Sequence, residues 1–389
     1  MKALPQDIAK AFDCAGLTVF PGFVDLHAHF REPGFESKET IATGSRAAAR
    51  GGYTTVCTMP NLNPAPDTLE HLQIQLDAIE RDAVIPVYPV GAITMGQKGH
   101  GTLSAMAEIA PHVVGFSDDG VGIRDGDQMR EAMRIAAKLD KPIIAHCEVK
   151  CLLNGGYIHD GDYCRAHGHK GICAESEWLM IARDLELARQ TECRYHVCHV
   201  SAKESVALIR TAKRRGVRVT CETAPHYLCL TDDDLQEDGR FKMNPPLRTR
   251  EDQLALIDGM IDGTIDAVAT DHAPHTREDK SNGLAGSAFG IVGLETAFAV
   301  LYTGLVRTDR LVLDRLIDLM SNNPRRLLRE WMHLPVPQTE TDFCLFDLSH
   351  TYKIDPNAFA SKGRSTPFDG MEVCGSCKAI VQNGKITRF

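Results

Sequence analysis

Short apolar runs alternate along the chain with longer segments in which apolar residues recur at helical spacing. This alternation is typical of a parallel sheet whose strands are joined by crossover helices. Strands are predicted at Gly22–His29, Tyr53–Met59, Val84–Ala92, Val113–Asp118, Pro142–Glu148, Tyr195–Val200, Val217–Thr223 and Asp266–Asp271. Amphipathic helices are predicted between them, among others at Lys38–Arg50, Gln128–Leu139, Glu175–Arg189 and Lys203–Arg214.

Eight parallel strands are the number that closes into a barrel whose interior is filled by side chains. An open, doubly wound sheet is the alternative fold. It is disfavoured because no glycine-rich GxGxxG turn follows the first predicted strand. The pattern therefore favours an α/β fold with a (β/α)8 barrel over residues 20–337.

The two ends of the chain depart from this alternation. The beginning contains one plausible strand, around Ala11–Val19, and the tail from about Asp342 reads as short strands with turns. Asn383-Gly384 is a strong signal for a β-hairpin. We expect residues 1–19 and 338–389 to form together a small β-sandwich domain beside the barrel.

The amino-acid composition argues against several classes of protein. Hydrophobic residues make up 43% and charged residues 24% of the 389 residues, as in ordinary globular proteins. A net charge of −9 without a Lys/Arg-rich run argues against nucleic acid or an anionic membrane as a partner. No signal peptide or membrane span is apparent. The thirteen cysteines lie mostly in apolar runs, which indicates reduced thiols in a cytoplasmic protein, and Cys374-Gly-Ser-Cys377 is read as incidental.

Histidines and aspartates gather where the predicted strands end. The first strand ends in His27-Ala28-His29, and side chains two residues apart in a strand point to the same side. In a (β/α)8 barrel the catalytic groups lie at the C-terminal ends of the strands. Later strand ends carry further candidate ligands, namely Asp118-Asp119, His146, His199 and Asp271.

This set of imidazoles and carboxylates suits Zn²⁺ or a similar divalent ion. Six ligands are too many for one tetrahedral ion and suit a pair, which lowers the pKa of bound water and polarises a carbonyl. The carboxylate on the eighth strand, Asp271, can bind one ion and take a proton from water. Only one of Asp118 and Asp119 is expected to point inward, since successive strand residues face opposite sides. The site therefore indicates metal-assisted hydrolysis or its reverse.

Further polar residues follow the same strand ends. Arg31, Asn61, Asn244 and His275 form a set of donors that suggests recognition of a substrate carboxylate, because a guanidinium group binds it through two hydrogen bonds. Each of them also has an ordinary interpretation as a surface or turn residue.

Other candidates are assigned lesser roles. Asp25 is expected to orient a ligand histidine from behind. His226 is a candidate for a position just outside the ligand set, and His196 is expected to face a helix. His167 and His169 are expected in a polar loop without a metal role.

The segment Pro21-Gly-Phe-Val-Asp-Leu-His-Ala-His-Phe-Arg-Glu-Pro-Gly resembles the first-strand signature of cyclic amidohydrolases, and of long bacterial dihydroorotases in particular. The resemblance continues in order over roughly residues 12–385. It is carried by Thr58-Met-Pro-Asn, Phe116-Ser-Asp-Asp-Gly-Val-Gly, Ala145-His-Cys-Glu, Cys198-His-Val-Ser, Glu222-Thr-Ala-Pro-His, Met243-Asn-Pro-Pro-Leu-Arg, Ala269-Thr-Asp-His-Ala-Pro-His and Phe289-Gly-Ile-Val-Gly-Leu-Glu-Thr.

The resemblance implies a metal-dependent barrel with an attached β-sandwich that converts N-carbamoyl-L-aspartate reversibly to L-dihydroorotate in pyrimidine biosynthesis. One or two zinc ions per subunit are implied, with two favoured. By the resemblance, His27 and His29 hold one metal, and His146 and His199 hold the second. Asp271 matches a residue that is both ligand and general base.

Asp119 matches the bridging position, where many relatives carry a carboxylated lysine; the spacing to His146 favours it over Asp118. The resemblance also assigns substrate contacts. Arg31, Asn61 and His275 match residues that hold the substrate carboxylate, and Asn244 with the backbone of Phe289 and Gly290 matches those that bind the ring amide edges.

Two alternatives remain open. The first is another cyclic amidohydrolase, a hydantoinase, dihydropyrimidinase or allantoinase, against which Asp119 and Arg31 argue. The second is a non-catalytic homologue that serves as a partner of aspartate carbamoyltransferase, against which the complete ligand set argues. A homodimer and an association with aspartate carbamoyltransferase are further expectations.

Relatives begin with additional strands before the stretch matching Ala11–Val19, so the β-domain is expected to lack its first strands.

Overall fold

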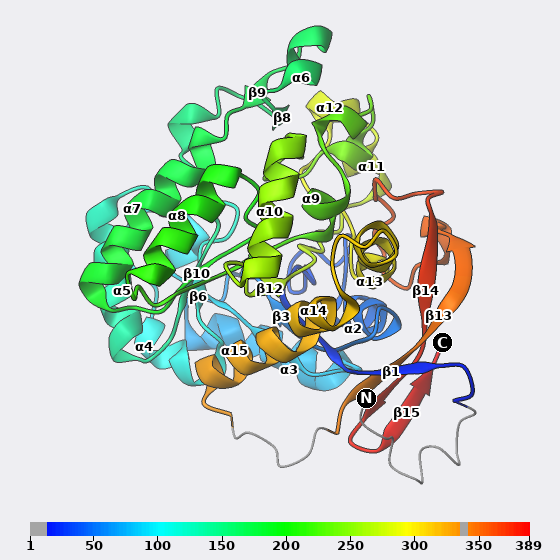
Figure 1. Ribbon diagram of the computed structural model, residues 1–389. Helices are drawn as coiled ribbons and strands as arrows, with labels where there is room; N and C mark the ends of the chain where they lie inside the picture. Colours follow the sequence, from blue (N-terminus) through cyan, green and yellow to red (C-terminus); the bar gives the residue numbers. More distant parts are fainter. Residues whose placement is uncertain (1–13, 335–340) are drawn as a thin grey trace.

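Parallel strands form a closed ring at the centre of the computed structural model, which describes residues 14–334 and 341–389 (Figure 1). One parallel sheet has the order β2-β3-β4, and a second has the order β5-β6-β7-β10-β11-β12. A parallel bridge between Ala28 and His272 joins the two sheets on one side, and the continuous segment from β4 to β5 joins them on the other. The strands are β2 (Phe23–Ala28), β3 (Tyr53–Thr58), β4 (Val87–Pro89), β5 (Gly91–Ala92), β6 (Phe116–Ser117), β7 (Ile143–Ala145), β10 (Tyr195–Val197), β11 (Val219–Thr223) and β12 (Ala267–Val268). The (β/α)8 barrel is confirmed.

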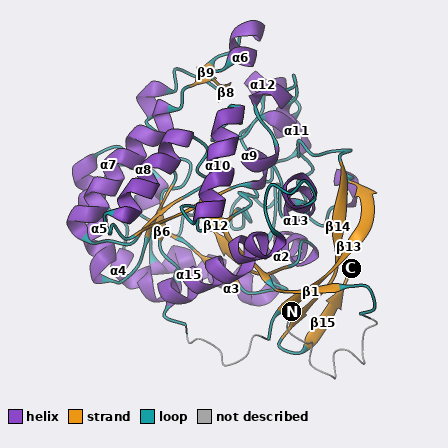
Figure 2. Cartoon of the chain, viewed as in Figure 1, coloured by secondary structure: helices purple, strands orange, loops and turns teal. Residues whose placement is uncertain are grey.

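Helices surround the ring of strands (Figure 2). Several begin at a side chain that caps the first turn: Thr40 and Thr249 form capping boxes, and Asp125 accepts hydrogen bonds from the first turn of its helix. The helices around the barrel are α2 (Ile41–Arg50), α3 (Leu69–Asp82), α4 (Met106–Ile109), α5 (Gly126–Lys138), α7 (Glu175–Thr191), α8 (Lys203–Arg214), α10 (Arg250–Asp262), α13 (Ala297–Leu301), α14 (Leu313–Ile317) and α15 (Asn323–Met332).

Short helices, one strand pair and single helical turns lie in the loops. Four short helices, α6 (Asp162–His167), α9 (Pro225–Cys229), α11 (Arg277–Lys280) and α12 (Gly283–Gly286), and the strand pair β8 (Ile158–His159) and β9 (Gly171–Ile172) follow the C-terminal ends of strands. Single 3₁₀ turns lie at Met95–Gln97, Ala110–His112, Lys150–Leu152, Asp232–Asp234, Gly239–Phe241 and Pro356–Ala358, and π-helical turns at Tyr302–Val306 and Asp318–Asn322.

The N-terminal end of the barrel is closed by α15. Trp331, Leu327 and Leu328 of this helix belong to one apolar cluster with side chains of strands around the ring. The ammonium group of Lys141, just before β7, donates hydrogen bonds to the carbonyl oxygens of Val113 (2.8 Å) and Trp331 (3.0 Å). The polar residues at the other strand ends are therefore the ones left facing a cavity.

Residues from both ends of the chain share a four-stranded antiparallel sheet with the order β1-β13-β14-β15. These strands are β1 (Thr18–Pro21), β13 (Phe343–Lys353), β14 (Glu372–Gln382) and β15 (Lys385–Arg388). The predicted hairpin at Asn383-Gly384 is confirmed, and both turn residues have positive φ angles of 47° and 75°. Residues 11–13 of the first predicted strand and the expected boundary at residue 338 lie outside the described residues.

Two further observations concern the composition. Within the described residues, which include all thirteen cysteines, no disulfide is formed, and this holds for Cys374 and Cys377 of β14 as well. Within residues 14–334 and 341–389, none of the helices has the length and apolar character needed to traverse a bilayer.

Candidate metal centre and substrate pocket

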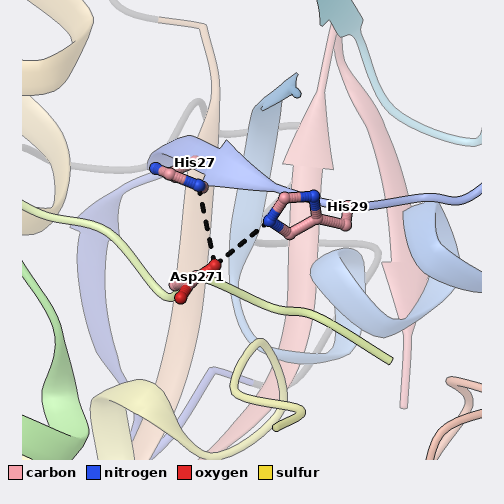
Figure 3. Close-up of side chains that lie close together, drawn as sticks. All are labelled: His27, His29 and Asp271. Carbon is pink, nitrogen blue, oxygen red and sulfur yellow. Dashed lines mark hydrogen bonds and ion pairs between the residues drawn. The ribbon is translucent and has the colours of Figure 1, made fainter. Parts of the chain in front are cut away.

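His27, His29 and Asp271 meet at the C-terminal end of the barrel (Figure 3). Oδ1 of Asp271 lies 3.2 Å from Nε2 of His29 and 3.6 Å from Nε2 of His27. All three side chains are buried. Burial alone would raise the pKa of Asp271, but the neighbouring histidines outweigh it and hold this pKa below its usual range. The carboxylate is therefore ionised among the imidazoles.

Asp119 lies between this group and a second pair of histidines. Its Oδ1 is 3.5 Å from Nε2 of His27, 3.7 Å from Nε2 of His199 and 3.9 Å from Nδ1 of His146. Its Oδ2 is 3.7 Å from Nε2 of His29. The structure thus brings one carboxylate next to all four histidines predicted as ligands.

Asp118 points the other way. Its carboxylate accepts hydrogen bonds from the backbone of Ile93 (2.8 Å), Thr94 (3.1 Å) and Gly99 (3.0 Å), and from the hydroxyl of Thr94. Asp118 thereby fixes the loop after β5. Of the two adjacent aspartates, the structure places Asp119 in the cluster, because consecutive side chains at a strand end face opposite sides.

The buried atoms of the cluster fit a divalent cation. His27 Nε2 and Asp119 Oδ1, which face each other at 3.5 Å in the cluster, are buried and have no hydrogen-bond partner. A buried polar atom left without a partner costs about 1–3 kcal/mol. The ligand atoms of His27, His29 and Asp271, and those of His27, Asp119 and His199, each lie within 4.8 Å of one another. Imidazole and carboxylate are ligands that zinc prefers.

Two of these residues also have an unusual backbone. His199 and Asp271, each just beyond a strand, have positive φ angles of 33° and 48°. A non-glycine residue in this region costs on the order of 1–3 kcal/mol. Such strain is concentrated at functional sites, where the surrounding packing maintains it.

Glu222 of β11 was missed by the sequence analysis. Its Oε1 lies 3.0 Å from Nδ1 of His27, and its Oε2 lies 3.2 Å from Nε2 of His196. Burial would raise the pKa of Glu222, but its contacts with both histidines lower it to about 2. This carboxylate fixes the ring of His27 so that Nε2 faces the cluster. The available signal was an acid within an apolar predicted strand, which needs a buried partner.

The expected role of Asp25 is corrected by these contacts. Asp25 accepts hydrogen bonds from the backbone N–H of His27 (3.1 Å) and from the N–H and hydroxyl of Thr270 (3.1 and 2.5 Å). It therefore ties the first strand to the eighth and orients no imidazole. The prediction was wrong because sharing a strand face with His27 does not bring the carboxylate within reach of its ring.

A cavity of about 310 Å³ opens above the cluster. Every predicted site residue except His27, which is fully buried, lines this cavity. The lining residues are His29, Arg31, Asn61, Asp119, His146, His199, Asn244, Asp271, His275, Phe289 and Gly290, together with Gly120, Glu148, Lys150, Leu153, Gly156, Ile172 and Ala273.

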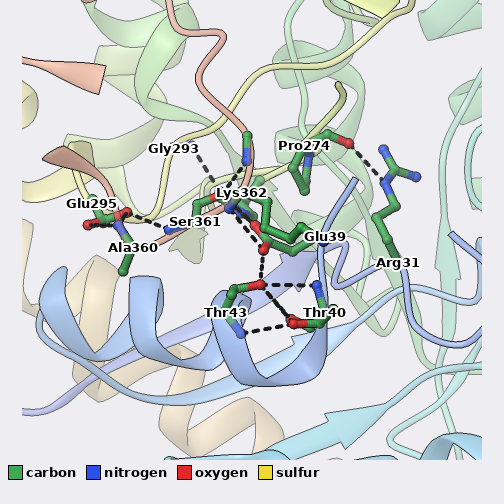
Figure 4. Close-up of polar contacts among 12 residues, drawn as sticks. Arg31, Glu39, Thr40, Thr43, Pro274, Gly293, Glu295, Ala360, Ser361 and Lys362 are labelled. Atoms are coloured by element: carbon green, nitrogen blue, oxygen red, sulfur yellow. Dashed lines mark hydrogen bonds and ion pairs between the residues drawn. The ribbon is translucent and has the colours of Figure 1, made fainter. Parts of the chain in front are cut away.

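Arg31 and His275 form the cationic side of the cavity. Nη2 of Arg31 lies 3.4 Å from Nε2 of His275, and its Nε donates to the carbonyl oxygen of Pro274 at 3.3 Å (Figure 4). Burial and the charges of Arg31 and Lys38 lower the pKa of His275 to about 3. Burial lowers the pKa of Arg31 only to about 10, so Arg31 remains charged beside a neutral imidazole. Asn61 donates to the carbonyl oxygen of Asp119 at 3.0 Å.

A second polar group on the wall was also missed. Nδ2 of Asn244 donates to Oε1 of Glu148 at 2.7 Å, and Nζ of Lys150 lies 2.5 Å from Oε2 of the same carboxylate. Oε2 also lies 3.8 Å from Nε2 of His146. Burial would raise the pKa of Glu148, but His146 and Lys150 hold it well below its usual range. Glu148 therefore fixes which end of the Asn244 amide faces the cavity.

Behind the eighth strand, Glu39 links three parts of the chain (Figure 4). Its Oε2 lies 3.3 Å from Nε2 of His272, and its Oε1 accepts from the backbone of Lys362 at 3.1 Å. The hydroxyls of Ser361 and Thr43 also donate to it. The C-terminal segment is thereby anchored against the residue next to Asp271.

The remaining histidines lie outside the cavity wall. His226 is buried against Tyr227 with ring centroids 4.1 Å apart, and burial lowers its pKa to about 4. His196 packs on Trp331 of α15, as predicted. His167 is the last residue of α6, where a loop was predicted, and His169 contacts Glu237 at 2.8 Å.

Comparison with known proteins places this geometry among enzymes of related chemistry. The family model "Dihydro-orotase-like" matches residues 16–205. A dihydroorotase of Fusobacterium nucleatum subsp. nucleatum is 50% identical over 95% of this chain and 87% of its own length. A dihydroorotase of Anoxybacillus flavithermus is 48% identical over 97% of this chain and 88% of its own length. The solved structure of an L-hydantoinase (dihydropyrimidinase) from Arthrobacter aurescens superposes with a TM-score of 0.84 at 26% identity, covering 96% of this chain and 86% of that one.

Proposed function

The chain belongs to the dihydroorotase family, and on this premise we propose that its barrel mouth interconverts N-carbamoyl-L-aspartate and L-dihydroorotate plus water in pyrimidine (UMP) biosynthesis. As a member of this family it is a metal-dependent hydrolase of cyclic amides. One observation carries the proposal: the His/Asp cluster and the charged Arg31 line the same cavity. Metal-assisted chemistry and recognition of a carboxylate are therefore available within one small volume.

The proposed cofactor is zinc, with two ions per subunit. His27, His29 and Asp271 would hold one ion, His146 and His199 the other, and Asp119 lies between the two groups at 3.5–3.9 Å. When bound, such ions acidify water and polarise a carbonyl group. The unpartnered buried ligand atoms support this assignment.

Asp271 is proposed as the general base. Its Oδ1 faces His27 and His29, which leaves Oδ2 to take a proton from water. In the hydrolytic direction, the water oxygen bonds to the ring amide carbon, the carbon–nitrogen bond breaks, and Asp271 delivers the proton to the departing nitrogen. Ring closure is the same sequence in reverse.

Substrate orientation is proposed to depend on two sides of the cavity. Arg31 and the neutral His275, with Asn61, bind the substrate carboxylate. On the other side, Asn244 donates Nδ2 to Glu148, so its Oδ1 is the atom that accepts an N–H of the substrate ring. The backbone of Phe289–Gly290 binds the adjacent amide edge.

A second candidate activity is hydrolysis of hydantoin or dihydropyrimidine, favoured by the similarity to the L-hydantoinase. Asp119 between the histidines, without a lysine at that place, and the charged Arg31 favour dihydroorotate. A non-catalytic role beside aspartate carbamoyltransferase is disfavoured because every matched ligand is present, with His146 3.9 Å from Asp119 and the others grouped within ligand distance.

Turnover assays with metal analysis test the proposed function. The purified protein is assayed with L-dihydroorotate, N-carbamoyl-L-aspartate, dihydrouracil, hydantoin and allantoin, and bound metal is determined on the same sample. We expect turnover of the first two compounds and close to two zinc ions per chain. Metal-loaded protein that acts on none of them would refute the enzyme assignment, and a preference for hydantoin or dihydrouracil would support the second candidate.

The resemblance also leads us to propose a homodimer in the cytoplasm that can associate with aspartate carbamoyltransferase. Light scattering of the protein alone and mixed with that enzyme tests the assembly.

We further propose that residues 20–337 form the barrel domain and that residues 1–19 and 338–389 form the second domain. Limited proteolysis tests this division, with cleavage expected near residue 337, because residues 19 and 20 lie inside the paired strand β1.

A further inference from the structure

Lys280, the last residue of α11, is buried beside the substrate cavity. Its ammonium group donates hydrogen bonds to the carbonyl oxygens of Lys242 (3.0 Å), Ala288 (2.7 Å) and Gly290 (2.7 Å). Among the described residues, Lys280 has no carboxylate within ion-pair distance. The positive charge of Lys280 is therefore stabilised by backbone carbonyl dipoles alone. Each of the three ammonium protons is used in one of these hydrogen bonds.

These three carbonyls belong to the two segments that form one wall of the cavity. Ala288 and Gly290 flank Phe289, and Lys242 lies two residues before Asn244. The N–H of Gly290 also donates to the carbonyl oxygen of Lys242 at 3.1 Å. Lys280 thus joins the segment that presents the Asn244 amide to the segment that presents the Phe289–Gly290 backbone.

The joined wall has little freedom to shift. Gly290 has a φ of 125°, and a Cβ at this position would lie 2.8 Å from both Cβ and the carbonyl oxygen of Ala273, which follows Asp271 closely. The ring of Phe289 is held by the ammonium of Lys242, 4.6 Å from its centroid. The same ammonium lies 5.3 Å from the ring centroid of Tyr157 and donates to the carbonyl oxygen of Ala285 at 2.9 Å.

We propose that Lys280 is a positioning residue that sets substrate affinity by bracing the Ala288–Gly290 segment against the Lys242–Asn244 segment. This inference rests on the proposed function, because it assumes that the substrate ring is bound by these segments. Lys280 touches neither the substrate nor the His/Asp cluster. Its loss should therefore weaken binding and leave the chemical step nearly unchanged.

Lys141 provides a matched control at the opposite end of the barrel. It is also a buried lysine, and it donates to the carbonyl oxygens of Val113 and Trp331. Replacement of either lysine by methionine leaves carbonyl oxygens without a donor and should lower the melting temperature. Only the replacement at Lys280 should change substrate binding.

The test compares wild type, Lys280→Met, Lys280→Arg and Lys141→Met in the metal-loaded form. For Lys280→Met we expect KM for L-dihydroorotate to rise about tenfold, the effect of roughly 1.4 kcal/mol, with kcat within about threefold of wild type. Lys280→Arg should restore KM to within about threefold, and Lys141→Met should leave KM unchanged. Calorimetry with N-carbamoyl-L-aspartate and metal-depleted protein should show the same order of affinities without turnover.

A measurement on Lys280→Arg keeps the inference testable if Lys280→Met does not fold. Burial and the Lys242 ammonium lower the pKa of Lys280 to about 7, while Asp238 and Asp279 act in the opposite direction. His275, which faces the same lysine, is neutral over this range. Between pH 7 and 9 the wild-type KM should rise relative to that of Lys280→Arg, because arginine stays charged.

The outcomes separate the two proposals. Absence of wild-type turnover of dihydroorotate would refute the proposed function. Wild-type turnover combined with an unchanged KM in Lys280→Met, or with equal rises in KM for both methionine variants, would refute the role of Lys280. A KM ratio between wild type and Lys280→Arg that is constant with pH would refute it as well.

Discussion

At the N-terminal end of the barrel, Lys141 is buried and donates to backbone carbonyl oxygens, one of them that of Trp331 in α15. At the C-terminal end, by contrast, buried atoms such as His27 Nε2 and Asp119 Oδ1 have no hydrogen-bond partner. Because a buried polar atom is costly without a partner, these atoms of the second end fit a bound ion, whereas the ammonium group of Lys141 has its partners within the chain. Substitutions at the two ends should therefore separate stability from activity.

The largest difference between the effect on activity and the effect on stability is expected for Asp271→Ala at the C-terminal end of the barrel. Loss of a general base removes about 10²–10⁴-fold in rate, and the simultaneous loss of a ligand removes more. The melting temperature of the metal-depleted protein should stay close to that of wild type. Steady-state kinetics and thermal unfolding measure the two effects. A variant that keeps near-native kcat would show that Asp271 is not the base.

The adjacent residues Asp118 and Asp119 allow the same comparison between stability and activity at a single strand end. Asp119→Asn should lose most of the bound metal and the activity, because its carboxylate lies next to four imidazoles. Asp118→Asn should keep its metal and lose stability, because its carboxylate holds the backbone of Ile93, Thr94 and Gly99. Metal analysis and urea unfolding of both variants distinguish the roles, and the reverse pattern would exchange the two assignments.

Trp331→Ala tests the opposite end of the barrel. Removal of a buried aromatic side chain should cost about 3–5 kcal/mol of unfolding free energy, because a cavity is left beside His196 and in the apolar cluster beneath the strands. Below the unfolding transition, KM and metal content should match those of wild type. Urea unfolding with parallel kinetics measures both. A large change in KM would show that the two ends are coupled.

Arg31→Ala is expected to affect substrate binding alone. A hydrogen bond to a charged group is worth about 1.5–3 kcal/mol, so KM for dihydroorotate should rise roughly 10- to 100-fold. Arg50→Ala, which removes an exposed arginine paired with Glu295, is the control and should leave KM unchanged. Equal KM values for wild type and Arg31→Ala would eliminate the proposed carboxylate contact.

The smallest effect concerns the pH dependence of stability. Burial lowers the pKa of Lys141 to about 8 from an ordinary value of 10.5. The unfolded chain therefore binds this proton more tightly, and the contribution of Lys141 to stability is full above pH 10.5 and is lost as the pH falls through 8. Between pH 8 and 10, wild type should gain stability relative to Lys141→Met. Denaturant unfolding at each pH measures the difference, and parallel curves would contradict the shift.

The predictions from sequence succeeded where one local pattern determines the result. Each of the eight apolar runs contains at least part of a barrel strand, although the strands are shorter than the runs. In β6, for example, only Phe116–Ser117 forms the strand, although the preceding Val114 and Gly115 also make backbone hydrogen bonds to Pro89 and Gly91. The alternation of side chains along the strand did not decide which of Asp118 and Asp119 points inward. The resemblance favoured Asp119, and the structure places Asp119 in the cluster.

The missed residues depend on contacts between distant parts of the chain. Glu222 reaches His27 from a strand 195 positions away, and Asn244 reaches Glu148 from 96 positions away. Lys280 was overlooked because a lysine at the end of a short polar helix normally lies in solvent, and its carbonyl partners come from two other segments. Without a pattern along the chain, such pairings follow only from the three-dimensional structure.

The central claim is that metal-assisted chemistry and the recognition of a carboxylate share the mouth of the barrel. The most direct measurement is the ratio of kcat/KM for L-dihydroorotate to that for dihydrouracil, which lacks the carboxylate, in zinc-loaded wild type and in Arg31→Ala. The account predicts a large ratio in wild type that falls at least about tenfold in the variant. A wild-type ratio near one, or a ratio that the variant leaves unchanged, would contradict it.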